Sequence, residues 1–140
     1  MTVRDYRYIS LILASIFFIV GLVFLLIPNL VIESFNIFSI RLGMKLIPRM
    51  ENNIYLILAV AYMYLLSLLA FLMYKKPYIE IYPYMLTQAK FCSSILSLLF
   101  FILKNQYLIY LVNYIIDFFW ALLVLYLYQK SKERFIRKNF

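Results

Sequence analysis

The sequence predicts an all-α membrane protein, in which four transmembrane helices form an up-down-up-down bundle and a short interfacial helix lies in the first loop. Two observations predict this class: apolar residues make up 66% of the 140 positions and charged residues only 14%, and the mean hydropathy is +0.90. A soluble domain has about half apolar and roughly a quarter charged residues. In so small a chain this apolar excess would leave broad patches facing water, which lipid removes. Since no polar stretch is long enough for a second domain, residues 1–140 are expected to form a single integral membrane domain.

Four apolar stretches are long enough to cross a hydrocarbon layer about 30 Å thick. They are predicted at residues 9–27, 54–74, 83–103 and 107–128. The first ends at Pro28 and is expected to be a retained helix, because its apolar core is too long for a signal peptide and no small-residue cleavage site follows. Asn52 or Asn53 is expected to cap the second span, and Lys75 and Lys76 suit the negative end of its dipole.

The third span contains a polar anomaly. Only 13 uncharged residues separate Lys90 from Lys104, which is too few to cross the bilayer. The helix must therefore begin earlier, near Pro83, since proline suits the first turn of a helix. Thr87, Gln88 and Lys90 are then expected within the membrane or at its boundary.

The segment between the first two spans is too apolar for a free loop. Its apolar residues fall at helical spacing, with the basic ones on another face: Ile37, Ile40, Met44 and Ile47 against Arg41 and Lys45. This pattern predicts a short helix in the membrane interface. A plug packed over the bundle is the alternative.

Basic residues are distributed unevenly between the two sides of the predicted bundle. With four spans, both termini lie on one side together with four basic residues near the ends of the first two spans and five in the C-terminal tail: Arg4, Arg7, Lys75 and Lys76, and the five between Lys130 and Lys138. The other side has four: Arg41, Lys45, Arg49 and Lys104. The excess predicts cytoplasmic termini and a plasma (inner) membrane location.

The residues that are missing or rare exclude several function classes. The chain has no His, one Cys and two Gly, which removes the usual haem and transition-metal ligand, any CxxC pair and any glycine-rich phosphate loop. We therefore expect no cofactor, no metal and no catalysis. The net charge of +8 does not indicate nucleic-acid binding, because the basic residues are scattered over helix ends instead of lining one face.

Small and hydroxyl residues form stripes on two of the spans. They are Ser10, Ala14 and Gly21 on the first span, and Thr87, Lys90, Ser94 and Ser97 on the third. Transmembrane helices approach one another at such residues. We expect helix packing along both stripes.

Asp117 is the strongest candidate for a functional residue. It lies midway along the fourth span, where an ionised aspartate costs at least about 2.5–3.5 kcal/mol, so it must face the interior and find partners. One predicted partner is Lys90, roughly 6 Å away in depth, although the two side chains should lean in opposite directions. The arrangement that we favour is instead a network of Asp117 with Asn113 and tyrosine hydroxyls. The full candidate intramembrane polar network is Lys90, Asn113, Asp117, Tyr62, Tyr64, Thr87 and Ser94.

Three functions are compatible with these residues. The main prediction is a small non-catalytic membrane protein: an accessory, anchoring or assembly subunit of a larger membrane complex, or a homo-oligomeric scaffold. Its partners would be membrane lipids and other membrane subunits or copies of itself. The alternatives are a small proton-coupled transporter using Asp117 and Lys90, and a lipid- or quinone-binding module.

Two kinds of small membrane protein are similar to this chain in helix count. A four-helix multidrug exporter of the small kind carries its key acid in the first helix, where the predicted span here has none, so that likeness is limited to size and helix count. The chain also resembles small DoxX-like membrane proteins in helix count and length, without a shared motif.

Overall fold

The computed structural model describes residues 2–49 and 54–138, which contain five helices. They are α1 (Val3–Leu26), α2 (Pro28–Arg41), α3 (Ile54–Lys75), α4 (Ile81–Leu103) and α5 (Leu108–Lys138). Four of the helices are long and apolar enough to cross a membrane: α1, α3, α4 and the Leu108–Lys132 part of α5. The predicted all-α class with four spans and a short helix in the first loop is therefore confirmed.

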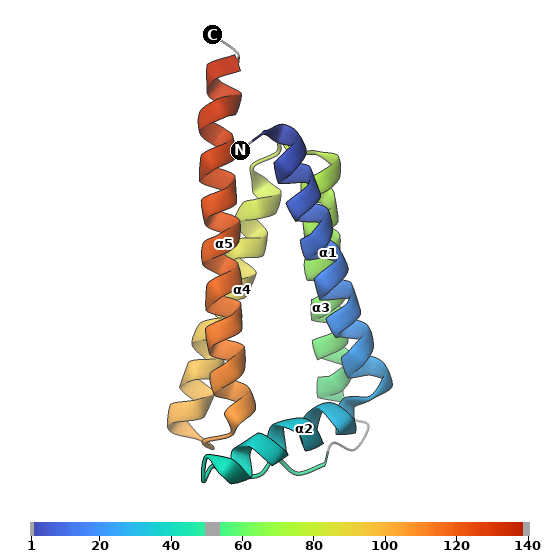
Figure 1. Ribbon diagram of the computed structural model, residues 1–140, viewed down its shortest axis with the longest axis vertical. Coiled ribbons are helices and arrows are strands. Elements are labelled where there is room, and N and C mark those ends of the chain that lie inside the picture. The colour runs from blue at the N-terminus through green and yellow to red at the C-terminus, as the bar shows by residue number, and fades with distance from the viewer. Residues whose placement is uncertain (1, 50–53, 139–140) are drawn as a thin grey trace.

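The four long helices form two antiparallel pairs (Figure 1). α1 packs along α3 and α4 packs along α5, whereas α3 and α4 make a smaller contact and α1 and α5 barely touch. Both termini lie at one end of the bundle. α2 crosses the other end, where it contacts both α1 and α5.

α1 begins before the predicted start at residue 9 because a capping box stabilises its first turn. The Thr2 hydroxyl accepts from the Asp5 amide at 3.1 Å, and the Asp5 carboxylate accepts from the Thr2 amide at 2.7 Å. These two bonds satisfy N–H groups that have no partner inside the helix. At the other end the chain turns at Ile27, and Pro28 starts α2, where a proline loses no helical hydrogen bond.

α2 ends earlier than the spacing of its apolar residues predicted. Gly43 adopts a φ of 64°, a left-handed conformation that glycine accepts without steric cost, and it ends the helix. Met44 and Ile47 therefore lie outside the helix, which corrects the prediction that they share its apolar face. The Asn36 side-chain amide holds the following segment, donating to the Ile47 carbonyl at 2.9 Å and accepting from the Ile47 amide at 2.8 Å.

α4 runs without interruption from Ile81 through Lys90 to Leu103. This confirms that the third span extends back to Pro83, which lies within the first turn where its missing N–H leaves no bond unmade. The expected cap residues of the second span, Asn52 and Asn53, lie outside the described residues.

The small-residue stripe of α1 packs against α3, as predicted. Ser10, Ala14 and Gly21 are all buried, and the Ser67 hydroxyl of α3 donates to the Ala14 carbonyl at 2.8 Å. A Cβ atom at Gly21 would lie 3.1 Å from Cβ of Met63. Glycine therefore allows the two helices to approach closely at this point.

The apolar core occupies the half of the bundle nearest the termini. All four long helices contribute fully or largely buried side chains to it: Tyr6, Leu13, Ala14, Phe17, Leu66, Leu69, Ala70, Met73, Leu86, Val124 and Leu127. Toward α2 the two helix pairs diverge (Figure 1). The tightly packed core therefore does not extend to the end of the bundle that α2 crosses.

Candidate functional site

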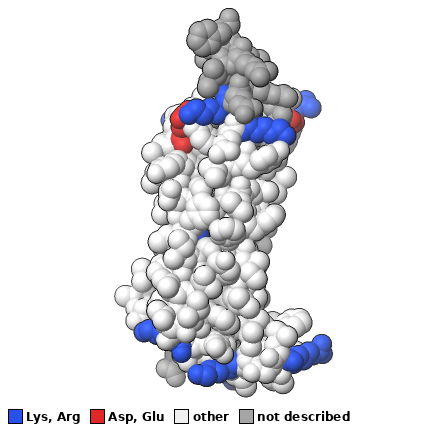
Figure 2. All heavy atoms as spheres, turned by 90° about the vertical axis from the view of Figure 1, so that its left-hand side faces the viewer, with Lys and Arg blue, Asp and Glu red and all other residues white. Residues whose placement is uncertain are grey.

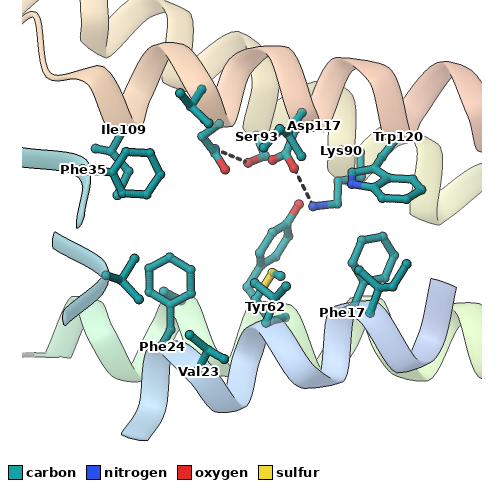
Figure 3. A pocket seen from close by; sticks show the side chains of 18 residues that line it. Phe17, Val23, Phe24, Phe35, Tyr62, Lys90, Ser93, Ile109, Asp117 and Trp120 are labelled. Atoms are coloured by element: carbon teal, nitrogen blue, oxygen red, sulfur yellow. Dashed lines mark hydrogen bonds and ion pairs between the residues drawn. The ribbon is translucent and has the colours of Figure 1, made fainter. Parts of the chain in front are cut away.

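A cavity of about 440 Å³ lies between the two helix pairs, on the α2 side of the core. All five helices contribute to its wall, which is mostly apolar. Phe17 and Trp120 contact each other edge to face, with ring centroids 6.0 Å apart, and Phe35 of α2 lies toward the opposite end (Figure 3). The cavity is within the 300–1,000 Å³ range of small-molecule sites, which are typically apolar with a few converging polar groups.

Lys90 and Asp117 form an ion pair in the wall of this cavity. Nζ of Lys90 lies 2.6 Å from Oδ1 of Asp117, and the two side chains expose only 3% and 4% of their surfaces. The favoured arrangement expected Asn113 and tyrosine hydroxyls as the partners of Asp117, whereas the structure contains the direct pair. The opposite lean of the two side chains does not prevent it, because the four methylenes of lysine span the offset in depth.

Two aromatic rings surround the Lys90 ammonium in addition to the carboxylate. Nζ lies 4.8 Å from the centre of the Phe17 ring and 5.9 Å from the centre of the Tyr62 ring. Ring faces carry negative charge and stabilise a cation within about 6 Å. α1, α3 and α5 therefore each stabilise the charge that α4 carries into the membrane.

Asn113 and Tyr62 line the cavity with the ion pair, but their hydrogen bonds are to groups other than Asp117. Asn113 donates to the Ser97 hydroxyl at 2.7 Å and to the Ser93 hydroxyl at 3.4 Å. The Tyr62 hydroxyl donates to the Ala89 carbonyl at 2.9 Å. These contacts join α5 to α4 and α3 to α4, and they place further polar atoms beside the pair (Figure 3).

The other predicted members of the network do not line the cavity. Ser94 is buried between α4 and α5, where its hydroxyl donates to the Tyr114 carbonyl at 3.0 Å, and Thr87 is buried one turn before Lys90. Tyr64 is 60% exposed, so its inclusion in the network was wrong. Tyr62 and Tyr64 are about 200° apart around the helix, and only one of them can face the interior.

The cavity residues that were not among the predicted site residues include Ser93, Phe17 and Trp120. Ser93 follows Lys90 by three positions and therefore lies on the same helical face, a signal that the sequence contained. The two aromatic residues gave no such signal, because in an apolar span they cannot be distinguished from core residues or lipid-facing residues by spacing alone.

A second hollow, of about 870 Å³, borders α3, α4 and α5. It contains Tyr55, Cys92, Phe100 and Lys104 and shares Tyr62 and Ser93 with the first cavity. The Tyr62 side chain, which donates to the Ala89 carbonyl, therefore borders both spaces.

The charges outside the cavity gather at the two ends of the molecule. Figure 2 shows Lys and Arg at both ends, with Asp and Glu beside them at one end, and a broad band of other residues between them. This distribution is that of a protein whose middle section contacts hydrocarbon. Within residues 2–49 and 54–132, no three acidic or cysteine side chains are close enough together to hold a metal ion.

The buried pair and its polar neighbours are the groups of the cavity wall that are able to bind and orient a polar group. They offer hydrogen-bond donors and acceptors in an otherwise apolar space, where such contacts are strong. Comparisons with protein-family models, with curated proteins and with solved structures found no match to this chain.

Proposed function

We propose that this protein is a non-catalytic integral membrane protein that binds a lipid-soluble molecule in the cavity between its two helix pairs. The observation that supports this most directly is the cavity itself: a bundle that served only as a structural anchor would gain van der Waals contacts by closing it. Its apolar wall and its cluster of polar groups at one level match the usual composition of a ligand site.

The arrangement of the helices supports entry from the hydrocarbon layer. α2 lies across one end of the cavity and the packed core fills the other. The sides of α1 and α5 that line the cavity make little contact with each other, and Ile116 on this wall is 47% exposed. The same arrangement gives less support to a proton-coupled carrier using Asp117 and Lys90, which would need access from water on both sides.

A pair of matched variants tests the proposed binding. Ala59 and Ala61 are both exposed residues of α3, but only Ala59 lines the cavity. Ala59→Phe should fill part of the space. It should therefore reduce the amount of lipid-soluble molecule that stays bound to the purified protein after detergent exchange, measured by mass spectrometry. Ala61→Phe should leave that amount unchanged. Equal retention in the wild type and in Ala59→Phe would contradict the proposal.

A second candidate function is that of an accessory, anchoring or assembly subunit, or a scaffold of identical copies. It is supported by Tyr64, which directs its side chain outward midway along α3, next to exposed Ala61. Transmembrane helices meet through hydroxyl and small residues of this kind. Ala61→Phe should then weaken association with a second copy or another membrane subunit, measured by cross-linking in the membrane, while Ala59→Phe should not.

We also propose that the protein lies in the plasma (inner) membrane with both termini in the cytoplasm. The support is the excess of Lys and Arg on the side of the termini, because positively charged segments are retained on the cytoplasmic side. In this orientation α2 lies at the outer surface.

A further inference from the structure

The Lys90–Asp117 pair also determines which class of molecule suits the cavity, provided that the proposed binding is correct. Among the described residues that line the cavity, these two are the only charged ones. Their charges cancel, and they lie 2.6 Å apart. The polar part of the wall is therefore electrically neutral as a whole.

Lys90 does not need a further anion. Its ammonium already has the Asp117 carboxylate and the faces of the Phe17 and Tyr62 rings around it. A second anion near Lys90 would also lie close to Asp117, and repulsion is strong where water is excluded. A cation brought to Asp117 would be repelled by Lys90 in the same way. The site thus disfavours a charged group of either sign.

Hydrogen bonding remains available for a neutral group. The Ser93 hydroxyl lies on the same wall as the pair, and the Tyr62 hydroxyl points toward the pair from the opposite side (Figure 3). The Asn113 amide also lines the cavity. These groups include both donors and acceptors, so a hydroxyl or carbonyl group can bind among them without bringing a charge into the membrane.

The rest of the cavity provides space for an apolar body. Beyond Ser93 and Asn113, toward α2, the wall is formed by apolar side chains, including Val23, Phe24, Phe35 and Ile109 (Figure 3). We propose that the ligand is a neutral amphiphile of the membrane, with its hydroxyl or carbonyl head at the Lys90–Asp117 pair and its hydrocarbon part directed toward α2.

Trp120 provides a built-in reporter for this proposal. It is the only tryptophan of the chain, and it lines the cavity beside Lys90 (Figure 3). Bromine quenches indole fluorescence at short range, so three probes with the same brominated chain can be compared: a long-chain alcohol, an alkyl sulfonate and an alkyl trimethylammonium. The wild type should show saturable quenching by the alcohol, with an apparent affinity on the order of tenfold higher than for either ion.

A control variant separates the cavity from the surrounding lipid. Phe119 is adjacent to Trp120 and exposed on the outer face of α5. Moving the tryptophan there, with Trp120→Phe and Phe119→Trp combined, should leave only quenching that rises with the probe concentration in the membrane and does not saturate.

Removing one charge of the pair should reverse the preference in a defined direction. Asp117→Asn leaves the positive charge of Lys90 uncancelled, so the sulfonate should gain affinity relative to the alcohol. Lys90→Gln leaves the negative charge of Asp117, and the trimethylammonium probe should gain instead. If either variant does not fold, the ranking of the three probes in the wild type alone decides whether the site prefers a neutral head group.

The possible outcomes distinguish the two proposals. Absence of saturable quenching by all three probes would overturn the proposed binding function and this inference together. Saturable quenching in which a charged probe binds the wild type best would keep the binding function but overturn the neutral head group. A ranking that is the same in the wild type and in folded variants would place the head group away from the pair, which also overturns the inference.

Discussion

Lys90 and Asp117 connect α4 to α5 at the level where the packed core gives way to the cavity. Placing the charge of either residue inside a membrane costs free energy, and each charge is tolerated because the other lies 2.6 Å away. The two charges are therefore energetically dependent on one another. Loss of one affects the protein through the charge that remains.

The dependence predicts a double-mutant cycle with strong coupling. Removing one partner of a buried pair costs about 3–5 kcal/mol in soluble proteins, whereas polar contacts between membrane helices average about 0.6 kcal/mol. We expect Lys90→Met and Asp117→Leu each to lower the free energy of unfolding by about 1–3 kcal/mol, between these limits. The double variant should be more stable than either single variant, measured by unfolding in mixed micelles.

The exposed pair between Lys132 and Glu80, 3.2 Å apart, serves as the comparison for this cycle. Solvent screens it, so its two substitutions should show little coupling. If the effects of Lys90→Met and Asp117→Leu also simply added, the two residues would not stabilise each other in the membrane.

Glu80 gives a prediction for acid pH. A hydrogen bond from Tyr128, followed by one from Lys132, lowers the pKa of the Glu80 carboxyl below its usual value. Because the folded pKa is the lower one, the contact contributes stability above the ordinary glutamate pKa and is lost as the pH falls through the lowered value. Carboxyl NMR titration should show the lowered pKa rising more in Tyr128→Phe than in Lys132→Gln, and the reverse order would contradict this assignment.

Among the elements, α1 and α3 depend most on close approach. Gly21→Ala would bring its methyl group 3.1 Å from Cβ of Met63, so the neighbour must move by a few tenths of an ångström. Gly21→Leu cannot be accommodated in this way and should lower the free energy of unfolding by about 1–3 kcal/mol. Ser15→Leu, on the exposed side of the same helix, should cause no comparable loss.

The position of the segment after α2 should depend on the side chain of Asn36, which hydrogen-bonds to the Ile47 backbone. Its two bonds to the Ile47 backbone contribute about 0.5–1.5 kcal/mol each. Asn36→Ala should therefore increase hydrogen exchange at the Ile47 amide by about tenfold or more. Ser34→Ala is the control, because the Ser34 hydroxyl donates only within its own helix, to the Leu30 carbonyl. Unchanged exchange in Asn36→Ala would mean that other contacts hold the segment.

The elements were predictable to different degrees for physical reasons. The four spans follow from the length and apolar content of the chain, since the bilayer requires both. The shortage of uncharged residues after Lys90 was sufficient to extend α4 back to Pro83. The end of α2 was not predictable from its apolar spacing, because the left-handed turn at Gly43 ends the helix before Met44.

The polar site was predictable in its residues more than in its geometry. Position within a span was enough to identify Asp117 and Lys90, because charge is costly there. Their distance depends on how far a flexible lysine reaches, which spacing does not determine. The side of α3 that faces inward also depends on packing, so Tyr62 lies at the site and Tyr64 does not.

At the scale of the whole molecule, the proposed orientation leads to a simple test. A reporter fused after Lys130 should be active in the cytoplasm, and one inserted between residues 36 and 49 should report the exterior. The reason is the excess of basic residues on the side of the termini. The opposite pair of signals would reverse the orientation and place α2 at the cytoplasmic surface.

The position of α2 has a consequence for the membrane around the protein. The helix pairs converge near the termini and are held apart where α2 crosses between them (Figure 1). The molecule is therefore a wedge, and it takes up more area in the leaflet that contains α2 than in the opposite leaflet. A wedge fits best where its wider side faces the convex surface of a bent bilayer. In a flat bilayer the lipids beside α2 must tilt to follow its sides.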